Sequence, residues 1–170
     1  MSGVSLVIGS TGLIGKKLIF ELAKKDSEVI AISRRSISNL PENVTLLNFN
    51  FDDFLDNGCV PSCDHIYICL GTTIKKAGSQ SEFKKVDFDY SVSFARKARE
   101  AGATKISLVS SVGANPYAKN FYLKIKGEVE EEIKKIDFQS INIFRPSLLL
   151  GHREEGRFLE KIGQNLSSFI

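Results

Sequence analysis

The stretch Gly9-Ser10-Thr11-Gly12-Leu13-Ile14-Gly15 decides how this chain is expected to fold. It directly follows the apolar run Val4 to Ile8 and leads into a helix-like stretch, Leu13 to Lys24. Gly9 permits a tight turn from strand to helix, Gly12 lets a phosphate approach the backbone, and Gly15 allows close packing of helix on strand. Because the first N–H groups of a helix are free and its dipole is positive there, the pattern predicts a turn that binds a diphosphate.

Length and charge indicate one small domain with a small-molecule ligand. The chain has 170 residues, and its 23 basic and 20 acidic residues are mixed along the sequence, which gives a net charge of +3. Such a balance does not indicate nucleic acid or an anionic membrane as a partner. We therefore expect a single domain, residues 1–170, that acts on a small-molecule substrate, and we leave a homodimer or a protein partner open.

The N-terminus and the cysteines predict a cytoplasmic protein. The first apolar run reads as a short strand and not as a secretion signal, and no stretch is long enough to span a bilayer. Three cysteines, an odd number, favour a reducing compartment. The group Cys59, Cys63, His65 and Cys69 matches no usual zinc spacing, so no metal is expected. Cys69 lies in an apolar run and is expected to be buried and protonated.

Apolar runs separated by helical or loop segments predict six strands. They are Val4 to Ile8, Glu28 to Ser33, Val44 to Asn48, His65 to Leu70, Lys105 to Ser110 and Ser140 to Phe144. Alternation of this kind predicts an α/β fold, a doubly wound parallel sheet with helices on both faces in three α/β/α layers, as in the dinucleotide-binding Rossmann fold.

Two later segments have the period of amphipathic helices. From Ser81 to Gly102 the segment has apolar residues at three- and four-residue steps and ends in a glycine; this stripe is Phe83, Val86, Tyr90, Phe94 and Ala98. From Lys119 to Lys135 the period aligns one stripe of Tyr122, Lys126, Val129 and Ile133. Before the first of these helices, Gly71 and Gly78 indicate a loop.

The end of the second expected strand indicates which dinucleotide fits. An acidic side chain there would bond the ribose 2′-hydroxyl of NAD and repel a 2′-phosphate. This chain has Ser33, Arg34 and Arg35 instead, and guanidinium groups are good partners for a phosphate, so NADP(H) is favoured over NAD(H). Asp52 is a candidate acceptor for the adenine amino group; alternatively, Asp52 or Asp53 is the N-cap of a short helix.

Tyr122 and Lys126 are four residues apart, which places both on one helix face. A nearby ammonium stabilises a phenolate and so suits a phenol to proton transfer near neutral pH. Ser110 and Ser111 end the fifth strand shortly before, at the edge where open parallel sheets bind ligands. We therefore predict a catalytic group of Ser111, Tyr122 and Lys126. Ser111 is chosen because alternation turns only one of the two serines toward the cleft.

A series of short motifs occurs in one order along the chain. They are Gly9 to Gly15, Cys69-Leu-Gly71-Thr72-Thr73, Val86-Asp87-Phe-Asp89-Tyr90, Ser110-Ser111-Val-Gly113-Ala, Tyr122-x-x-x-Lys126, Lys126-Gly-Glu-Val-Glu130 and Phe144-Arg145-Pro146. With them the chain resembles the extended or atypical short-chain dehydrogenase/reductase superfamily, and within it the Tat-interacting-protein-like oxidoreductases. The resemblance covers about Val4 to Gly151.

The resemblance implies an NAD(P)-dependent oxidoreductase that acts on a small carbonyl or alcohol. It implies that residues beside the fourth strand border the cofactor, namely Leu70, Gly71 and Thr72, and that Pro146 and Ser147 approach the nicotinamide amide. Ser111 would orient the substrate, and Tyr122 would transfer the proton while Lys126 holds the nicotinamide ribose. Two alternatives stay open: a non-catalytic protein that senses NADP and binds a partner, and a nucleotide-sugar epimerase or dehydratase.

The chain departs from the pattern in two places. Asp87 stands where many extended members have Asn, which leaves a polar relay through that position uncertain. Relatives also continue beyond a helix like Arg157 to Leu166, whereas this sequence stops at residues 167–170. We therefore expect it to lack part of the region that shapes the substrate pocket.

Overall fold

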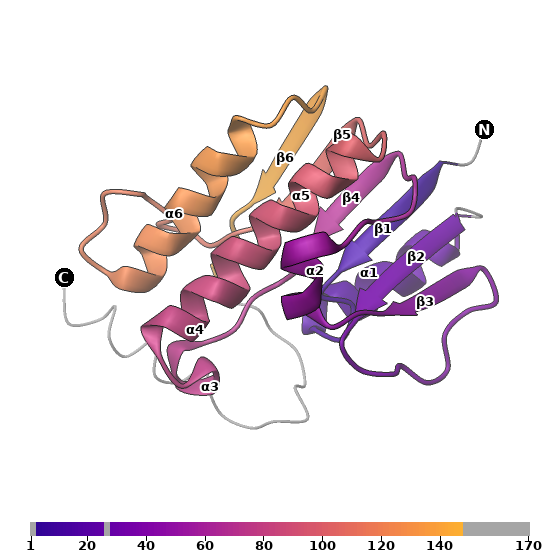
Figure 1. Cartoon of the computed structure of the whole chain (residues 1–170), viewed down its shortest axis with the longest axis horizontal. Coiled ribbons are helices and arrows are strands. Elements are labelled where there is room, and N and C mark those ends of the chain that lie inside the picture. The colour runs from indigo at the N-terminus through magenta and orange to yellow at the C-terminus, as the bar shows by residue number, and fades with distance from the viewer. Residues whose placement is uncertain (1–2, 26–27, 148–170) are drawn as a thin grey trace.

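A sheet of six parallel strands forms the centre of the molecule. The structure, a computed structural model, describes residues 3–25 and 28–147. The strands are β1 (Val4–Ile8), β2 (Glu28–Ser33), β3 (Val44–Asn48), β4 (His65–Ile68), β5 (Lys105–Val109) and β6 (Ser140–Phe144). Their order is β3-β2-β1-β4-β5-β6 (Figure 1). This confirms the predicted doubly wound sheet, with β4 and β5 ending slightly earlier than predicted, as strand boundaries often do.

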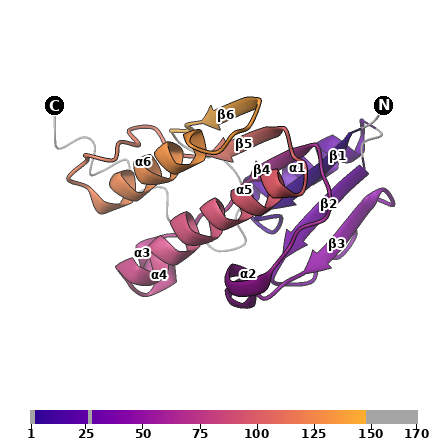
Figure 2. The ribbon, with the colours of Figure 1, turned by 45° about the horizontal axis from the view of Figure 1, so that its top comes forward.

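Helices cover both faces of this sheet. The helix α1 (Leu13–Ala23) lies behind it in Figure 1, whereas α2 (Phe51–Asn57), α5 (Tyr90–Glu100) and α6 (Phe121–Lys134) lie in front; Figure 2 shows the same layers from above. The short helix α4 (Gln80–Lys84) leads into α5. The predicted three layers are therefore present.

The alternation of side chains along the strands builds two separate apolar layers. Leu6 and Ile8 of β1 belong to the large layer under α2, α5 and α6. Val7, between them in the sequence, packs with Ile19 of α1 in the smaller layer. All four side chains have no more than 1% of their surface exposed. The period of two that predicted strands therefore also determines which residues face which helices.

The helix predicted over residues 81–102 is interrupted by a π-helical turn. In this turn, η1 (Lys85–Asp89), the N–H of Tyr90 donates to the carbonyl of Lys85, five residues back. The wider turn changes which side chains point inward, so Asp87 is buried where the predicted stripe had Val86, which is only half-buried. Turns of this kind occur frequently at functional sites. The period of the sequence gave no sign of it.

The loop predicted after the fourth strand contains one further helical turn, α3 (Ile74–Ala77). The Thr73 hydroxyl caps it by accepting a hydrogen bond from the N–H of Lys76 at 3.1 Å. Gly78 ends it with a φ of +90°, a conformation that suits glycine. The segment therefore holds a defined shape next to the carboxyl end of β4.

Candidate functional site

The glycine turn lies where the strand order reverses, between the carboxyl ends of β1 and β4. Gly9 has a φ of +83°, and a Cβ there would lie 2.6 Å from the backbone of Cys69. A Cβ on Gly15 would lie 2.3 Å from the carbonyl oxygen of Gly9. Neither position has room for a side chain, so these two glycines allow α1 to start directly against the strand ends. Open α/β sheets bind their ligands at this kind of switch point.

The start of α1 differs from the other helix starts that have a cap. Gly12 is its N-cap in extended conformation, no side chain caps it, and no acidic residue lies in its first turn. In contrast, a side chain accepts a backbone N–H bond at the start of α2, α3, α4 and α6; the capping residues are Asn50, Thr73, Ser79 and Asn120. The Ser10 hydroxyl is turned inward and donates to the carbonyl of Ile32 at 2.9 Å. The α1 terminus therefore fits an anionic diphosphate.

Positive charge gathers at the end of β2. The buried hydroxyl of Ser33 accepts a hydrogen bond from the N–H of Arg35 at 3.0 Å, which shapes the turn after the strand. The guanidinium of Arg34 lies over the ring of Phe51 at 5.5 Å from its centroid. Both arginines are exposed. The arrangement provides cations, and no carboxylate, at the position that contacts the adenosine ribose in dinucleotide-binding folds.

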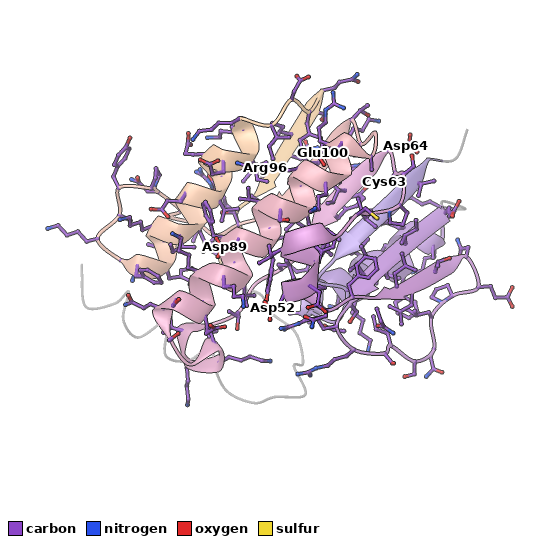
Figure 3. All side chains as sticks on the ribbon, in the orientation of Figure 1. Asp52, Cys63, Asp64, Asp89, Arg96 and Glu100 are labelled. Carbon is purple, nitrogen blue, oxygen red and sulfur yellow. The ribbon has the colours of Figure 1, made fainter. Side chains whose placement is uncertain are left out.

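The structure corrects one interpretation of Asp52. The N-cap of α2 is Asn50, so neither Asp52 nor Asp53 caps the helix, because it begins at Phe51. The carboxylate of Asp52 instead accepts a hydrogen bond from the Tyr90 hydroxyl at 2.5 Å and lies 2.6 Å from Nζ of Lys85. The Lys85 ammonium and then the Tyr90 hydroxyl hold the pKa of Asp52 below its ordinary value. Asp52 lies near the start of α2, below α5 (Figure 3). Its predicted contact with adenine stays a prediction.

Tyr122 and Lys126 both lie on the inner side of α6. Lys126 is buried, with 8% of its side chain exposed, and its Nζ lies 2.7 Å from Oδ1 of Asp87. Tyr122 is half-buried, and its ring centroid lies 5.7 Å from that of Phe83. The predicted phenol and ammonium therefore share one helix face, and the ammonium has a carboxylate partner that the sequence reasoning had left without a role.

The two serines at the end of β5 have different surroundings. Ser110 is buried, and its hydroxyl donates to Oε1 of Glu130 at 2.5 Å. Ser111 is half-buried, and its hydroxyl has a longer bond, 3.3 Å, to the carbonyl of Val112. This favours Ser111 over Ser110 as the residue that reaches a ligand, although its role stays a prediction. Glu130 could have been found by its position, four residues after Lys126 on the buried stripe of the helix.

Hydrogen bonds of backbone groups hold the two loops that were predicted to border the cofactor. The N–H of Thr72 donates to Oδ2 of Asp87 at 2.9 Å, so the Leu70 to Thr72 segment is tied to the π-helical turn. The carbonyl of Pro146 accepts the N–H of Val112 at 3.1 Å, so the segments after β5 and β6 lie side by side. The carboxyl edge of the sheet thus brings together most of the predicted site residues.

Cys63 and Cys69 provide no activated thiol. Burial raises the pKa of Cys69 to about 12 and that of Cys63 to about 11, so both are neutral near pH 7. Cys69 is half-buried and not fully buried as expected. Within residues 3–25 and 28–147, no three or more metal-ligating side chains form a group that could hold a metal ion. His65 instead bonds the Ser107 hydroxyl at 2.9 Å.

The strand order, the uncapped glycine start of α1 and the polar groups at the carboxyl edge define a Rossmann-type nucleotide-binding domain. The family model for the NAD dependent epimerase/dehydratase family matches residues 5–153. The chain belongs to this family, as the resemblance to extended short-chain dehydrogenases/reductases implied.

Curated relatives refine this placement. Protein FMP52, mitochondrial, of Eremothecium gossypii is 36% identical over 154 residues, which cover 88% of this chain and 68% of that protein. Protein HTATIP2 of Rattus norvegicus is 35% identical over 157 residues, which cover 89% of this chain and 64% of that protein. The chain therefore spans about two thirds of these relatives. The likeness to HTATIP2 confirms the predicted resemblance to Tat-interacting-protein-like proteins.

Solved structures share the fold at lower identity. Human epimerase family protein SDR39U1 (isoform 2) with NADPH has a TM-score of 0.66 at 20% identity, covering 98% of this chain and 59% of that one. MoeE5 in complex with UDP-glucose and NAD has a TM-score of 0.68 at 16% identity, covering 84% of this chain and 54% of that one. These neighbours confirm the Rossmann-type architecture.

The comparisons overturn the expected cytoplasmic location. FMP52 relatives from Eremothecium gossypii, Candida albicans and Saccharomyces cerevisiae are named mitochondrial, which contradicts the predicted cytoplasmic location. The prediction was wrong because free thiols indicate only a reducing environment, and the cytosol is not the only such compartment. None of the helices in the described part of the chain is long and apolar enough to cross a membrane.

The helix-like stretch Arg157 to Leu166 lies outside the described residues.

Proposed function

We propose that this protein is an oxidoreductase that binds NADP(H) and interconverts a small carbonyl compound and its alcohol. The observation that carries the proposal is the start of α1, which no side chain caps, together with the buried Lys126 and the half-buried Tyr122 on one face of α6. Membership in the NAD dependent epimerase/dehydratase family supports the class of cofactor. A nicotinamide dinucleotide would supply the hydride donor or acceptor there.

The residues of the chain divide the remaining work. The Tyr122 hydroxyl donates a proton to the carbonyl oxygen in reduction and accepts one from the alcohol in oxidation. The Ser111 hydroxyl orients that oxygen by a hydrogen bond. The Lys126 ammonium holds a ribose hydroxyl and favours negative charge on the phenol oxygen as the proton leaves. All three come from the carboxyl edge of β5 and from α6.

The preference for NADP(H) rests on the end of β2. Arg34 is held over Phe51 and Arg35 follows it, so two guanidinium groups are available to a 2′-phosphate. The names of the relatives HTATIP2 and FMP52 do not mention a cofactor. Among the structural neighbours, SDR39U1 is described with NADPH and MoeE5 with NAD, so they do not indicate which dinucleotide is preferred. The arginines are therefore the reason for the preference.

The family description favours one rival, epimerisation or dehydration of a nucleotide sugar. MoeE5, with which the chain shares its fold, is described in complex with UDP-glucose. Such reactions return the cofactor to its starting state, whereas our proposal requires net consumption of NADPH when a carbonyl substrate is present. Incubation of the protein with NADPH and a panel of small aldehydes and ketones separates the two: net loss of NADPH absorbance supports reduction.

A fluorescence titration with NADPH and with NADH tests cofactor binding. We expect wild type to bind NADPH at least about tenfold more tightly than NADH. Arg34→Ala should lose most of that preference, whereas Arg96→Ala, which removes an exposed arginine of α5, should keep it. Equal affinities that Arg34→Ala leaves unchanged would overturn the choice of cofactor. Failure of wild type to bind either dinucleotide would overturn the proposed function itself.

A further inference from the structure

A buried ion pair lies directly behind the predicted catalytic residues. The Asp87 side chain has no exposed surface, and its Oδ1 lies 2.7 Å from Nζ of Lys126, which is itself 8% exposed. Within the described residues, Oδ1 has no hydrogen bond of good geometry, so the Lys126 ammonium is what compensates its charge. A buried carboxylate is stable only with such a partner. The pair therefore joins the π-helical turn η1 to the middle of α6.

The second oxygen of Asp87 connects this pair to the loop after β4. Oδ2 accepts the N–H of Thr72 at 2.9 Å. A Cβ placed on the neighbouring Gly71 would lie 3.8 Å from both Oδ1 of Asp87 and Nζ of Lys126. Gly71 therefore lies directly beside both charged groups, and a side chain at this position would contact them. One carboxylate thus fixes both the lysine and the loop beside it.

We propose that Asp87 is a positioning residue for Lys126, an inference that rests on the proposed function. Its carboxylate, 2.7 Å from the ammonium, holds Nζ of Lys126 by charge beside Gly71, near the carboxyl edge of the sheet where the ribose hydroxyls would lie. The π-helical turn is what brings Asp87 inward. Where relatives have Asn, the neutral amide can bond the Thr72 N–H but cannot compensate a buried ammonium. In this chain the position of the Lys126 ammonium therefore depends on the negative charge of Asp87.

A double-mutant cycle with NADPH as the probe tests this dependence. Asp87→Asn keeps an acceptor for Thr72 but removes the charge, and Lys126→Met removes the ammonium with little change in volume. We expect Asp87→Asn to weaken NADPH binding at least about tenfold in wild type, and to change it less than about twofold in the Lys126→Met background. Asp89→Asn, the same change on the outer side of the helix (Figure 3), should leave NADPH affinity as in wild type.

The outcomes separate the inference from other roles of Asp87. An equal loss of affinity in both backgrounds would show that Asp87 acts only through the Thr72 loop, and unchanged binding in Asp87→Asn would show that it does not position Lys126; either result overturns the inference. If Asp87→Asn alone does not fold, the double variant still should, because a neutral pair leaves no charge buried alone. Folding of the double variant when the single one fails supports the charge dependence. Absence of NADPH binding in wild type refutes the proposed function instead.

Discussion

The guanidinium of Arg145, just after β6, binds both carboxylate oxygens of Glu130 in α6. Its Nε donates to Oε1 at 3.0 Å and its Nη2 donates to Oε2. The Ser110 hydroxyl also donates to Oε1. The Glu130 side chain is 2% exposed, whereas that of Arg145 is 49% exposed. These bonds tie the ends of β5 and β6 to α6, so they hold in place the segment that begins with Ser111.

Glu130→Gln should lower the free energy of unfolding at pH 7 by about 1–3 kcal/mol, because hydrogen bonds to a charged group are replaced by weaker ones. Urea denaturation measures the change. Glu131→Gln serves as the control, since Glu131 is exposed and forms a surface salt bridge with Lys134 one helical turn away. If Glu130→Gln lowers the free energy of unfolding no more than Glu131→Gln does, the hydrogen bonds of Glu130 with Arg145 and Ser110 do not stabilise the fold.

The same network predicts how stability changes in acid. Burial raises the pKa of Glu130, but the bonds from Arg145 and Ser110 outweigh burial and hold it below the ordinary value of 4.5. A lowered pKa in the folded state means that the stabilisation is present above the ordinary pKa and is lost as pH falls through the folded pKa. The difference in stability between wild type and Glu130→Gln should therefore shrink below about pH 4.

Two glycine variants should separate cofactor binding from folding. A Cβ on Gly12 would lie 3.3 Å from the carbonyl oxygen of Gly9, and its φ of −76° is open to alanine. Gly12→Ala should therefore fold but weaken NADPH binding by more than about tenfold, because its methyl group lies where the diphosphate approaches. In Gly15→Ala the Cβ would lie 2.3 Å from the same oxygen, so this substitution should lower the free energy of unfolding by about 1–3 kcal/mol. Thermal melts and NADPH titration of both proteins check the pair; normal binding by Gly12→Ala would contradict it.

The local sequence pattern was sufficient to predict much of this fold. Apolar alternation placed the strands, and Gly9, Gly12 and Gly15 placed the turn, because these features depend on a few neighbouring residues. The stripe of α6 was also predicted correctly, since Lys126, Val129 and Ile133 are all buried. Patterns of period 2 and 3.6 are read directly from a sequence.

The partners across the fold could not be predicted in this way. The ion pair between Asp87 and Lys126 joins residues 39 positions apart, and the π-helical turn that brings Asp87 inward has no sequence period of its own. The N-cap of α2 was misplaced because Asn50 and Asp52 are both good capping residues, and tertiary contacts of Asp52 with Tyr90 settle the choice. Such contacts depend on how distant segments pack.

Tyr122→Phe should remove turnover while keeping cofactor binding. The substitution deletes only the hydroxyl, and the ring can still pack against Phe83. We expect NADPH affinity within about twofold of wild type and a fall in NADPH oxidation with an active aldehyde of at least about 100-fold. Tyr117→Phe, at a position 92% exposed, is the matched control. Turnover that survives in Tyr122→Phe would remove this phenol from the proposed reaction.

His65 should make the protein less stable as pH falls from 6.5 to about 4. Its ring stacks on that of Tyr67 with centroids 4.0 Å apart and bonds the Ser107 hydroxyl. Burial, and to a lesser extent the charge of Lys105, lowers the pKa of His65 from 6.5 to about 4. Between these two values the unfolded chain binds a proton that the folded protein does not, so stability is complete above pH 6.5 and declines toward pH 4.

Because the ring is partly exposed, we expect this decline to be about 1–2 kcal/mol, less than the full shift would give. Urea denaturation of wild type and His65→Gln across this pH range isolates it, since glutamine does not titrate and the carboxylates contribute equally to both proteins. The wild-type curve should fall more steeply than that of His65→Gln through the window, and the two should run parallel below it. Parallel curves throughout would mean that the imidazole is protonated as readily in the fold as in the unfolded chain.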